Sequence, residues 1–288
     1  MKLSVIIISF NSNHLLKKLL LKIPKKHQVI IVENSQLKST KKLEKKFKNL
    51  KVIMPKENLG YSKGFNSALK HCKNHLILTF TPDVKIDKKL ISKLEKFLLI
   101  FQNFTIIAPE YKNQKIYKNF SPLDNKRLNI KKIKNFTVEQ VKEIDWCFCI
   151  INKKKIKTSD ILDNNYFMYF ETTDLCRKLI RLNHKLYIIK DLKFDHIGTG
   201  STKKIYNHEI LINRNWHYSW SKFYFFRKNN NYFYAIKKVL PNIYQNLIGI
   251  IISLFKLNMV ELSLHKSSLS GIISSILLRK SFYRPDIK

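Results

Sequence analysis

The first hundred residues alternate between short apolar runs and amphipathic stretches, and this alternation constrains the fold more than any other feature. Four runs have the length and the apolar, often β-branched character of buried strands: residues 3–9, 27–32, 51–54 and 76–80. Between them, the spacing of apolar side chains predicts helices over residues 13–23, 61–71 and 88–101. Strand and helix in turn at this spacing predict βαβ units, and therefore a mostly parallel sheet with helices on both faces.

The rest of the chain extends this sheet and then changes character. Further strands are predicted at residues 106–109, 144–151, 186–189 and 192–194, a helix at 170–182, and a hairpin or extended loop within 111–143. After His208, aromatic residues crowd 216–226, and an apolar segment at 243–257 lies among lysines. The sequence therefore predicts an α/β domain over residues 1–210, with halves 1–105 and 106–210, followed by a helical extension over 211–288.

The charge of the chain limits its partners. It carries 55 Lys and Arg residues against 20 Asp and Glu residues, a formal net charge of +35, which attracts polyanions, anionic lipid or a strongly anionic small ligand. Lysine far outnumbers arginine, the residue that reads bases through its bidentate fork, and the sequence contains no recognisable nucleic-acid-reading motif. A basic nucleic-acid-binding protein stays an alternative on charge alone, and no specific nucleic acid is expected as a partner.

Cysteine usage and the length of apolar runs indicate the compartment. The four cysteines form no C-x-x-C pair and no zinc-ligand spacing, which favours reduced thiols in a cytoplasmic protein. No run reaches the roughly 20 apolar residues that span a bilayer, so we expect no membrane crossing. The nine residues Leu247–Phe255 suit a helix lying on the anionic inner face of the cell membrane, or equally a helix packed against the rest of the chain. The predicted location is cytoplasmic and peripheral on that membrane.

Candidate ligand-binding residues follow the predicted strands, at the edge where open α/β sheets bind ligands. They are Phe10 and Asn11 after the first strand, Glu33 after the second, and a loop with Asn58, Gly60, Lys63, Gly64 and Asn66 before a helix. Glycines at the start of a helix let the backbone approach an anion, although a plain tight loop has the same pattern.

Two further residues have the chemistry of cation ligands. Asp83 follows the fourth strand, and one carboxylate with a phosphate-bearing substrate is the usual way to hold Mg²⁺. A neutral imidazole at His196, just before the segment Gly198–Ser201, suits the same ion. A turn-forming or capping role is the alternative for Asp83.

Glu171 and Asp174 follow the aromatic run 166–170 and lie three residues apart, so on a helix both carboxylates face the same side. Acidic residues also favour the first turn of a helix because of its dipole. The alternative is a general base beside an apolar wall that raises its pKa.

In their order along the chain, these motifs resemble those of the family 2 glycosyltransferases, and among them the bacterial rhamnosyltransferase-like members. The resemblance covers about residues 3–230 and rests on six short motifs: residues 4–11, 32–35, 58–66, 81–83, 167–177 and 196–201. It implies a GT-A nucleotide-sugar-binding fold. It also implies inverting transfer from a nucleotide-diphosphate sugar, such as a dTDP- or UDP-sugar, dTDP-rhamnose included. The implied acceptor is a hydroxyl of a cell-surface glycan or of a lipid-linked saccharide.

The resemblance also implies roles for individual residues. Phe10, Asn11 and Glu33 (where Asp is usual) would contact the base and ribose, and the loop with Asn58, Gly60, Lys63, Gly64 and Asn66 would lie near the nucleotide. Asp83 and His196 would hold Mg²⁺ or Mn²⁺. Asp145, Trp146 and Tyr169 would line the acceptor side, although Trp146 fits a core position equally well.

Two positions depart from the family pattern. Thr81 stands where an Asn or a second Asp is common, and Thr172 stands where the family has its catalytic Asp. Because a hydroxyl is no general base at neutral pH, the role of base passes to Glu171 or Asp174. We favour Glu171 as the base, with Asp174 orienting or binding the acceptor. A catalytically impaired relative that binds nucleotide sugars is the alternative.

Overall fold

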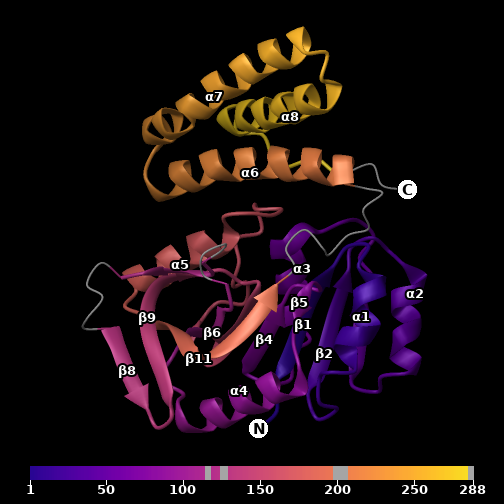
Figure 1. The fold of residues 1–288 in the computed structure, drawn as a ribbon, viewed down its shortest axis with the longest axis vertical. Helices are drawn as coiled ribbons and strands as arrows, with labels where there is room; N and C mark the ends of the chain where they lie inside the picture. The colour runs from indigo at the N-terminus through magenta and orange to yellow at the C-terminus, as the bar shows by residue number, and fades with distance from the viewer. Residues whose placement is uncertain (114–117, 124–128, 197–206, 285–288) are drawn as a thin grey trace. The chain divides into compact units, whose positions relative to one another are not determined.

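The computed structural model describes residues 1–113, 118–123, 129–196 and 207–284 (Figure 1). The chain forms two compact units. The first contains Met1–Leu59, Lys63–Leu162 and Leu175–Thr202, and the second contains Gly60–Ser62, Asp163–Asp174 and Lys203–Lys288. The domain boundary predicted after residue 210 lies near the last of these divisions. The grouping of two short segments with the C-terminal helices has no signature in the sequence.

Within the described residues, eleven strands of the first unit form one sheet in the order β3-β2-β1-β4-β10-β6-β11-β9-β7, with β5 paired to β11 and β8 to β9. Their bounds are β1 Ser4–Ser9, β2 Gln28–Glu33, β3 Leu50–Ile53, β4 Leu76–Phe80, β5 Val84–Lys85, β6 Ile106–Tyr111, β7 Phe120–Pro122, β8 Ile130–Ile133, β9 Phe136–Ile144, β10 Phe148–Asn152 and β11 Leu186–His196. The first four strands along the chain pair in parallel, and β11 is parallel to β6. The predicted α/β fold with a mostly parallel central sheet is confirmed.

The helices are α1 Asn13–Leu20, α2 Lys38–Lys41, α3 Gly60–Leu69, α4 Lys88–Ile100, α5 Glu171–Arg181, α6 Asn207–Asn229, α7 Tyr232–Phe255 and α8 Met259–Ile276, with 3₁₀ turns at Lys42–Lys45 and Lys153–Lys155. Side-chain caps explain where several begin. The Asp87 carboxylate accepts the Leu90 N–H at the start of α4, and Asn231 and Asn258 cap α7 and α8 in the same way.

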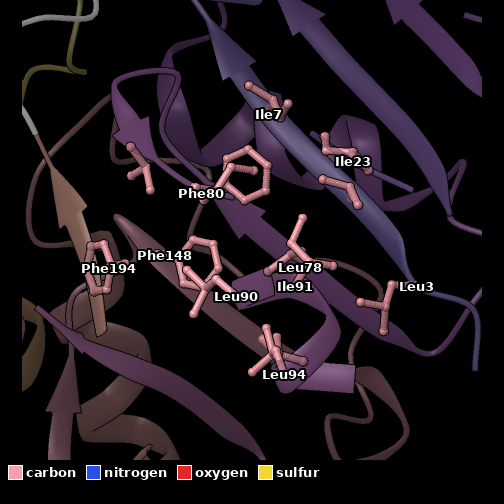
Figure 2. Close-up of a cluster of buried hydrophobic side chains, with 14 of the residues drawn as sticks. Leu3, Ile7, Ile23, Leu78, Phe80, Leu90, Ile91, Leu94, Phe148 and Phe194 are labelled. Carbon is pink, nitrogen blue, oxygen red and sulfur yellow. The ribbon is translucent and has the colours of Figure 1, made fainter. Parts of the chain in front are cut away.

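Alternating strand residues bury both faces of the parallel half of the sheet. Leu3, Val5 and Ile7 of the first strand segment share a core with buried leucines of α1 and α4, as the packing around Leu78 and Leu94 shows (Figure 2). The alternate residues of β1 point to the other face of the sheet. There α3 packs so closely that a Cβ on Gly64 would lie 3.5 Å from the side chain of Ile8. The sheet is therefore covered on both sides, as the sequence predicts.

The hairpin predicted within residues 111–143 is present, because β8 and β9 pair antiparallel with Ile133 opposite Phe136, and β7 pairs with β9 as well. Two details differ from the sequence-based expectation. The strand predicted at 144–151 is divided, because β9 ends at Ile144 and β10 begins at Phe148. The two strands predicted at 186–189 and 192–194 are a single strand, β11, whose register against β6 shifts between Ile189 and Lys193.

The helices α6, α7 and α8 of the second unit pack side by side (Figure 1). Among the described residues, α7 is long and apolar enough, with 24 residues, to cross a membrane by length and composition, and only 17% of its most apolar window is buried. This corrects the expectation that no segment has the length and apolar character of a span.

Replacing Leu78 by alanine tests the core. Leu78 is fully buried in β4 and pairs with Val5 and Ile150 on the neighbouring strands. We expect L78A to lower the free energy of unfolding by about 2–5 kcal/mol in urea denaturation, because a cavity replaces its packing. The control is L99A on α4, whose side chain is 63% exposed and whose loss is expected to cost less than about 0.5 kcal/mol. Equal losses in the two variants would contradict the assignment of Leu78 to the core.

Candidate active site

The polar end of β4 brings Asp83 against His196. The turn after β4 closes with the Val84 N–H donating to the Thr81 carbonyl at 3.1 Å, and β5 then pairs antiparallel with the end of β11, His196 opposite Val84. The His196 Nε2 consequently lies 3.1 Å from an Asp83 carboxylate oxygen and 3.3 Å from the Thr81 hydroxyl. Two residues more than one hundred positions apart thus meet at one strand end.

The turn between β9 and β10 adds Asp145 to this cluster. Because β10 runs antiparallel to β4, the turn lies beside Thr81, whose N–H donates to the Cys147 carbonyl at 3.1 Å. The Cys147 N–H in turn donates to the Asp145 carboxylate at 3.2 Å. The charge of Asp145 is one of those that stabilise protonated His196.

Burial and nearby charges shift the pKa values of the groups in this cluster. Burial alone would raise the pKa of the Asp83 carboxyl, but its hydrogen bonds with His196 and Thr81 lower that pKa overall. Burial likewise would lower the pKa of His196, but the hydrogen bond to Asp83 and the nearby carboxylates raise it. The side chain of Asp145 opens to solvent, yet the protein around its carboxylate limits hydration and raises its pKa. Negative charge is therefore concentrated around one imidazole.

Asp83 and His196 fit a divalent ion whose remaining coordination positions are filled by a bound ligand. Among the residues that the structure describes, no group of three or more His, Cys, Asp and Glu side chains could hold a metal alone. Asp83 and His196 supply one carboxylate and one imidazole, and an ion such as Mg²⁺ keeps its other positions for phosphate oxygens and water. The predicted segment Gly198–Ser201 that follows His196 lies outside the described residues.

Glu33 occupies a different role from the one expected. Its side chain is fully buried, and its two oxygens accept hydrogen bonds from the Ser9 hydroxyl at 2.7 Å, the Thr40 hydroxyl at 3.0 Å, and the N–H and hydroxyl of Ser35. A carboxylate with four donors inside the protein has little capacity left for a nucleotide. This corrects the expectation of a base or ribose contact: Glu33 ties the ends of β1 and β2 to α2.

Asn66 is a second correction of the same kind. Its side-chain amide donates to the Leu162 carbonyl at 2.7 Å, and its oxygen accepts the N–H groups of Ile161 and Leu162 at 3.1 and 3.2 Å. The residue is 3% exposed. Its side chain therefore fixes the backbone at residues 161–162 instead of facing a ligand.

The other predicted nucleotide residues remain at strand ends. Asn11 has a positive φ of 53° and its N–H donates to the Ser35 hydroxyl at 2.9 Å, while Asn34 accepts the Leu59 N–H at 3.2 Å. These bonds join the ends of β1 and β2 to the loop that contains Asn58. Phe10 and Asn58 are half-buried there, and Lys63 and Gly64 follow on α3, where Lys63 is exposed and Gly64 buried. Their contact with a nucleotide stays a prediction.

In the second unit, a strained turn precedes Glu171. Tyr169 and Phe170 both have positive φ values, 68° and 63°, and Glu171 then begins α5 with 8% of its surface exposed. Consecutive bulky residues in the left-handed region are costly, and such strain concentrates at functional sites. Contacts with α6 hold the turn: the rings of Tyr169 and Phe170 lie 5.6 and 5.4 Å from that of Tyr218.

Asp174 has both carboxylate oxygens occupied. Lys228 of α6 contacts one oxygen at 2.5 Å and Asn229 donates to the other at 2.6 Å. Lys228 also pairs with Asp163 at 2.7 Å, and although burial disfavours its charge, these carboxylates raise its pKa. The expected catalytic or acceptor-orienting role of Asp174 is thus replaced by an anchoring role between α5 and α6.

Two of the three predicted acceptor residues have packing roles in this structure. Trp146 is 2% exposed and its ring meets Phe65 edge-on at 5.2 Å, so it is a core residue and presents no face to an acceptor. Tyr169 packs on Tyr218, as described above. Asp145 is exposed and Tyr169 is half-buried.

Comparison with known proteins agrees with the fold. The family model "Glycosyl transferase family 2" matches residues 4–159, more than half of the chain. The mannosyltransferase PcManGT from Pyrobaculum calidifontis, in complex with GDP-Man and Mn²⁺, is similar in structure at 11% identity and a TM-score of 0.57, over 96% of this chain and 88% of that one. S. aureus TarS 1–349 in complex with UDP-GlcNAc is similar at 16% identity and a TM-score of 0.51, over 99% and 93%. None of the curated proteins matches in sequence.

The buried His217 of α6 makes the second unit sensitive to acid. Its ring stacks on Phe167 at 4.2 Å, its Nε2 donates to the Tyr283 carbonyl at 2.9 Å, and burial lowers its pKa from 6.5 to about 3. Below about pH 6.5 the unfolded chain therefore binds a proton that the folded chain refuses, and the free energy of unfolding falls as pH drops toward 3. In urea denaturation we expect a steeper loss toward low pH for the natural chain than for H217Q. An imidazole of His217 that titrates near 6.5 by NMR would contradict this.

Proposed function

The chain belongs to glycosyl transferase family 2, and on this premise we propose that it transfers a sugar from a nucleotide-diphosphate donor to an acceptor hydroxyl, with inversion at the anomeric carbon. The observation that carries the proposal is the contact of Asp83 with His196 at the carboxyl end of β4. Complexes of similar folds with GDP-Man and Mn²⁺, and with UDP-GlcNAc, support a nucleotide-sugar donor.

The finer assignment follows the motif order. We propose a UDP- or dTDP-sugar donor, including dTDP-rhamnose, and a cell-surface glycan or lipid-linked saccharide as acceptor, in polysaccharide biosynthesis at the cell envelope. The resemblance of the motifs to those of rhamnosyltransferase-like enzymes supports this choice. The basic surface, with a net charge of +35, also favours an anionic donor.

Three residues have proposed roles in the reaction. Asp83 and His196 would hold Mg²⁺ or Mn²⁺, which when bound supplies Lewis-acid neutralisation of the departing diphosphate. The reacting sugar carries oxocarbenium character while the bond to the diphosphate breaks. Glu171 would accept the proton of the acceptor hydroxyl on the opposite face of the sugar, a contribution of about 10²–10⁴-fold. Attack from that face inverts the anomeric centre.

Changing Asp83 to asparagine tests the cation site. We expect D83N to lose about 10²-fold or more of the metal-dependent transfer or hydrolysis rate, measured with a panel of UDP-, dTDP- and GDP-sugars, because the carboxylate that would hold the ion is gone. The matched control is D195N, a half-buried neighbour of His196 whose carboxylate pairs with Lys85 and accepts the His196 backbone N–H at 2.9 Å, a bond that the asparagine oxygen can still accept. D195N should keep most of the rate. Equal rates in the two variants would overturn the cation site, and binding of nucleotide sugars without turnover by the natural chain would favour the impaired relative.

Amide substitutions in α5 separate the base from the anchor. E171Q should lose about 10²–10⁴-fold in turnover while it still binds the donor, because the amide cannot take the acceptor proton. D174N should instead lower the melting temperature, since it removes the charge that pairs with Lys228, and it should keep most of the turnover per folded molecule. Initial rates, donor binding by calorimetry and thermal melting distinguish the two. Full turnover of E171Q would show that another group is the base.

A further inference from the structure

The end of α7 and the turn into α8 expose a continuous apolar surface, which we term the apolar ridge. Its members are large apolar side chains that are each at least 44% exposed: Leu247, Ile248, Ile251, Ile252, Leu254, Phe255, Leu257, Met259 and Val260. Phe255 and Leu257 are the most open, at 87% and 84%. Contiguous apolar surface of this kind marks an interaction site.

The side of α7 that faces α6 and α8 is apolar in its first half, where Ala235 and Val239 pack with Phe223 and Ile272, and polar farther along. Lys222 of α6 donates to the Asn242 side chain at 2.7 Å, and His265 of α8 contacts the Asn246 side chain at 3.1 Å. Ser253 is also buried on this side. The cavity among the three helices is lined largely by polar residues, with Asn215, Gln245 and Glu261 among them.

Small residues make the contact between α6 and α8. The Ser267 hydroxyl donates to the Ile212 carbonyl at 2.7 Å, and the backbones approach so closely at Gly271 that a Cβ there would lie 2.3 Å from the Trp216 carbonyl oxygen. A water-exposed bundle buries its large apolar residues and exposes its polar ones. Beside the apolar ridge, the contacts of α7 with α6 and α8 are polar and the large apolar side chains face outward, as in helices whose outer surface meets hydrocarbon.

The positive charge around the apolar ridge favours a lipid surface over a second copy of the chain as its partner. Residues 207–284 contain eleven Lys and Arg residues and two Glu residues, and Lys256 stands exposed within the apolar ridge itself. A second copy of this chain would bring like charges together, whereas anionic lipid headgroups attract them. Lysine stems also extend past apolar surface to place their ammonium groups at the headgroups.

The length of the apolar ridge limits how deeply it can enter a bilayer. From Leu247 to Phe255, where α7 ends, the helix rises about 12 Å, less than half of the roughly 30 Å hydrocarbon thickness of a bilayer. The first half of α7 carries Lys237, Lys238 and Pro241. We propose that the apolar ridge inserts into one leaflet of an anionic bilayer and holds the protein there without spanning it. This holds whichever sugar or acceptor the enzyme uses.

Vesicle flotation of the full chain tests the proposal. The protein should float with phosphatidylcholine vesicles that contain about a quarter phosphatidylglycerol, and much less with phosphatidylcholine alone. The combined variant I251S, F255S and L257S should partition roughly tenfold or more weakly. Because these side chains are exposed, its circular dichroism and unfolding should match the natural chain. The control replaces three exposed leucines of the first unit, L21S, L99S and L182S, and should bind as the natural chain does.

A fluorescent label reports the depth. In a C72S background, where the other three cysteines are buried, an environment-sensitive dye on L257C should shift to the blue with anionic vesicles. The same dye on F233C, at the other end of α7, should shift little. Equal flotation of the combined variant and the natural chain would overturn the proposal. So would a dimer in light scattering that the combined variant dissolves while neither protein binds vesicles.

Discussion

The contact between Asp83 and His196 depends on a strand of two residues. Only the pairing of β5 with the end of β11 brings the turn after β4 to a residue 113 positions away. The exposed ion pair of Lys85 with Asp195, at 3.1 Å, adds little to this pairing by itself. The turn that carries Asp83 is held on its other side by β4 and β10, whose residues are all buried and whose ladder continues into the bond from Thr81 to Cys147. A rigid strand holds a polar edge where ligand chemistry can take place.

Sequence periodicity predicts the half of the fold that obeys it. The strand predicted at 76–80 has those bounds in the structure, and the first helices differ from the prediction by a few residues at their ends. The prediction works here because, in buried parallel strands and amphipathic helices, the spacing of apolar residues follows directly from which positions are buried. The second half is harder. Strands β7 to β9 are mostly half-exposed, so their apolar pattern is weak, and Asp145 breaks an otherwise apolar run by forming the turn that contributes to the site.

The sequence predicts which residues lie at the candidate site, but it does not predict the hydrogen-bond partners of their side chains. Asp83 and His196 are found together as the motif order implies. Glu33 and Asn66 have the same residue types as ligand contacts, yet they saturate their hydrogen bonds inside the protein, since the loops at a strand end have orphan backbone groups of their own. What decides between the two roles is a remote partner: Leu162 is 96 residues from Asn66, and Lys228 is 54 residues from Asp174. No local pattern encodes such distances.

The strained turn before Glu171 connects the C-terminal helices to the proposed base. Two consecutive positive φ values at Tyr169 and Phe170 cost about 1–3 kcal/mol each, and a free loop would relax them. Within the second unit, α6 opposes that relaxation from both sides of the turn. Just before the turn, the Ser221 hydroxyl donates to the Met168 carbonyl at 2.9 Å. Just after the turn, Lys228 and Asn229 donate hydrogen bonds to the Asp174 carboxylate. The backbone that orients Glu171 is thus held by a helix that sequence patterns place outside the nucleotide-binding fold, so α6 acts as a positioning element for the proposed base.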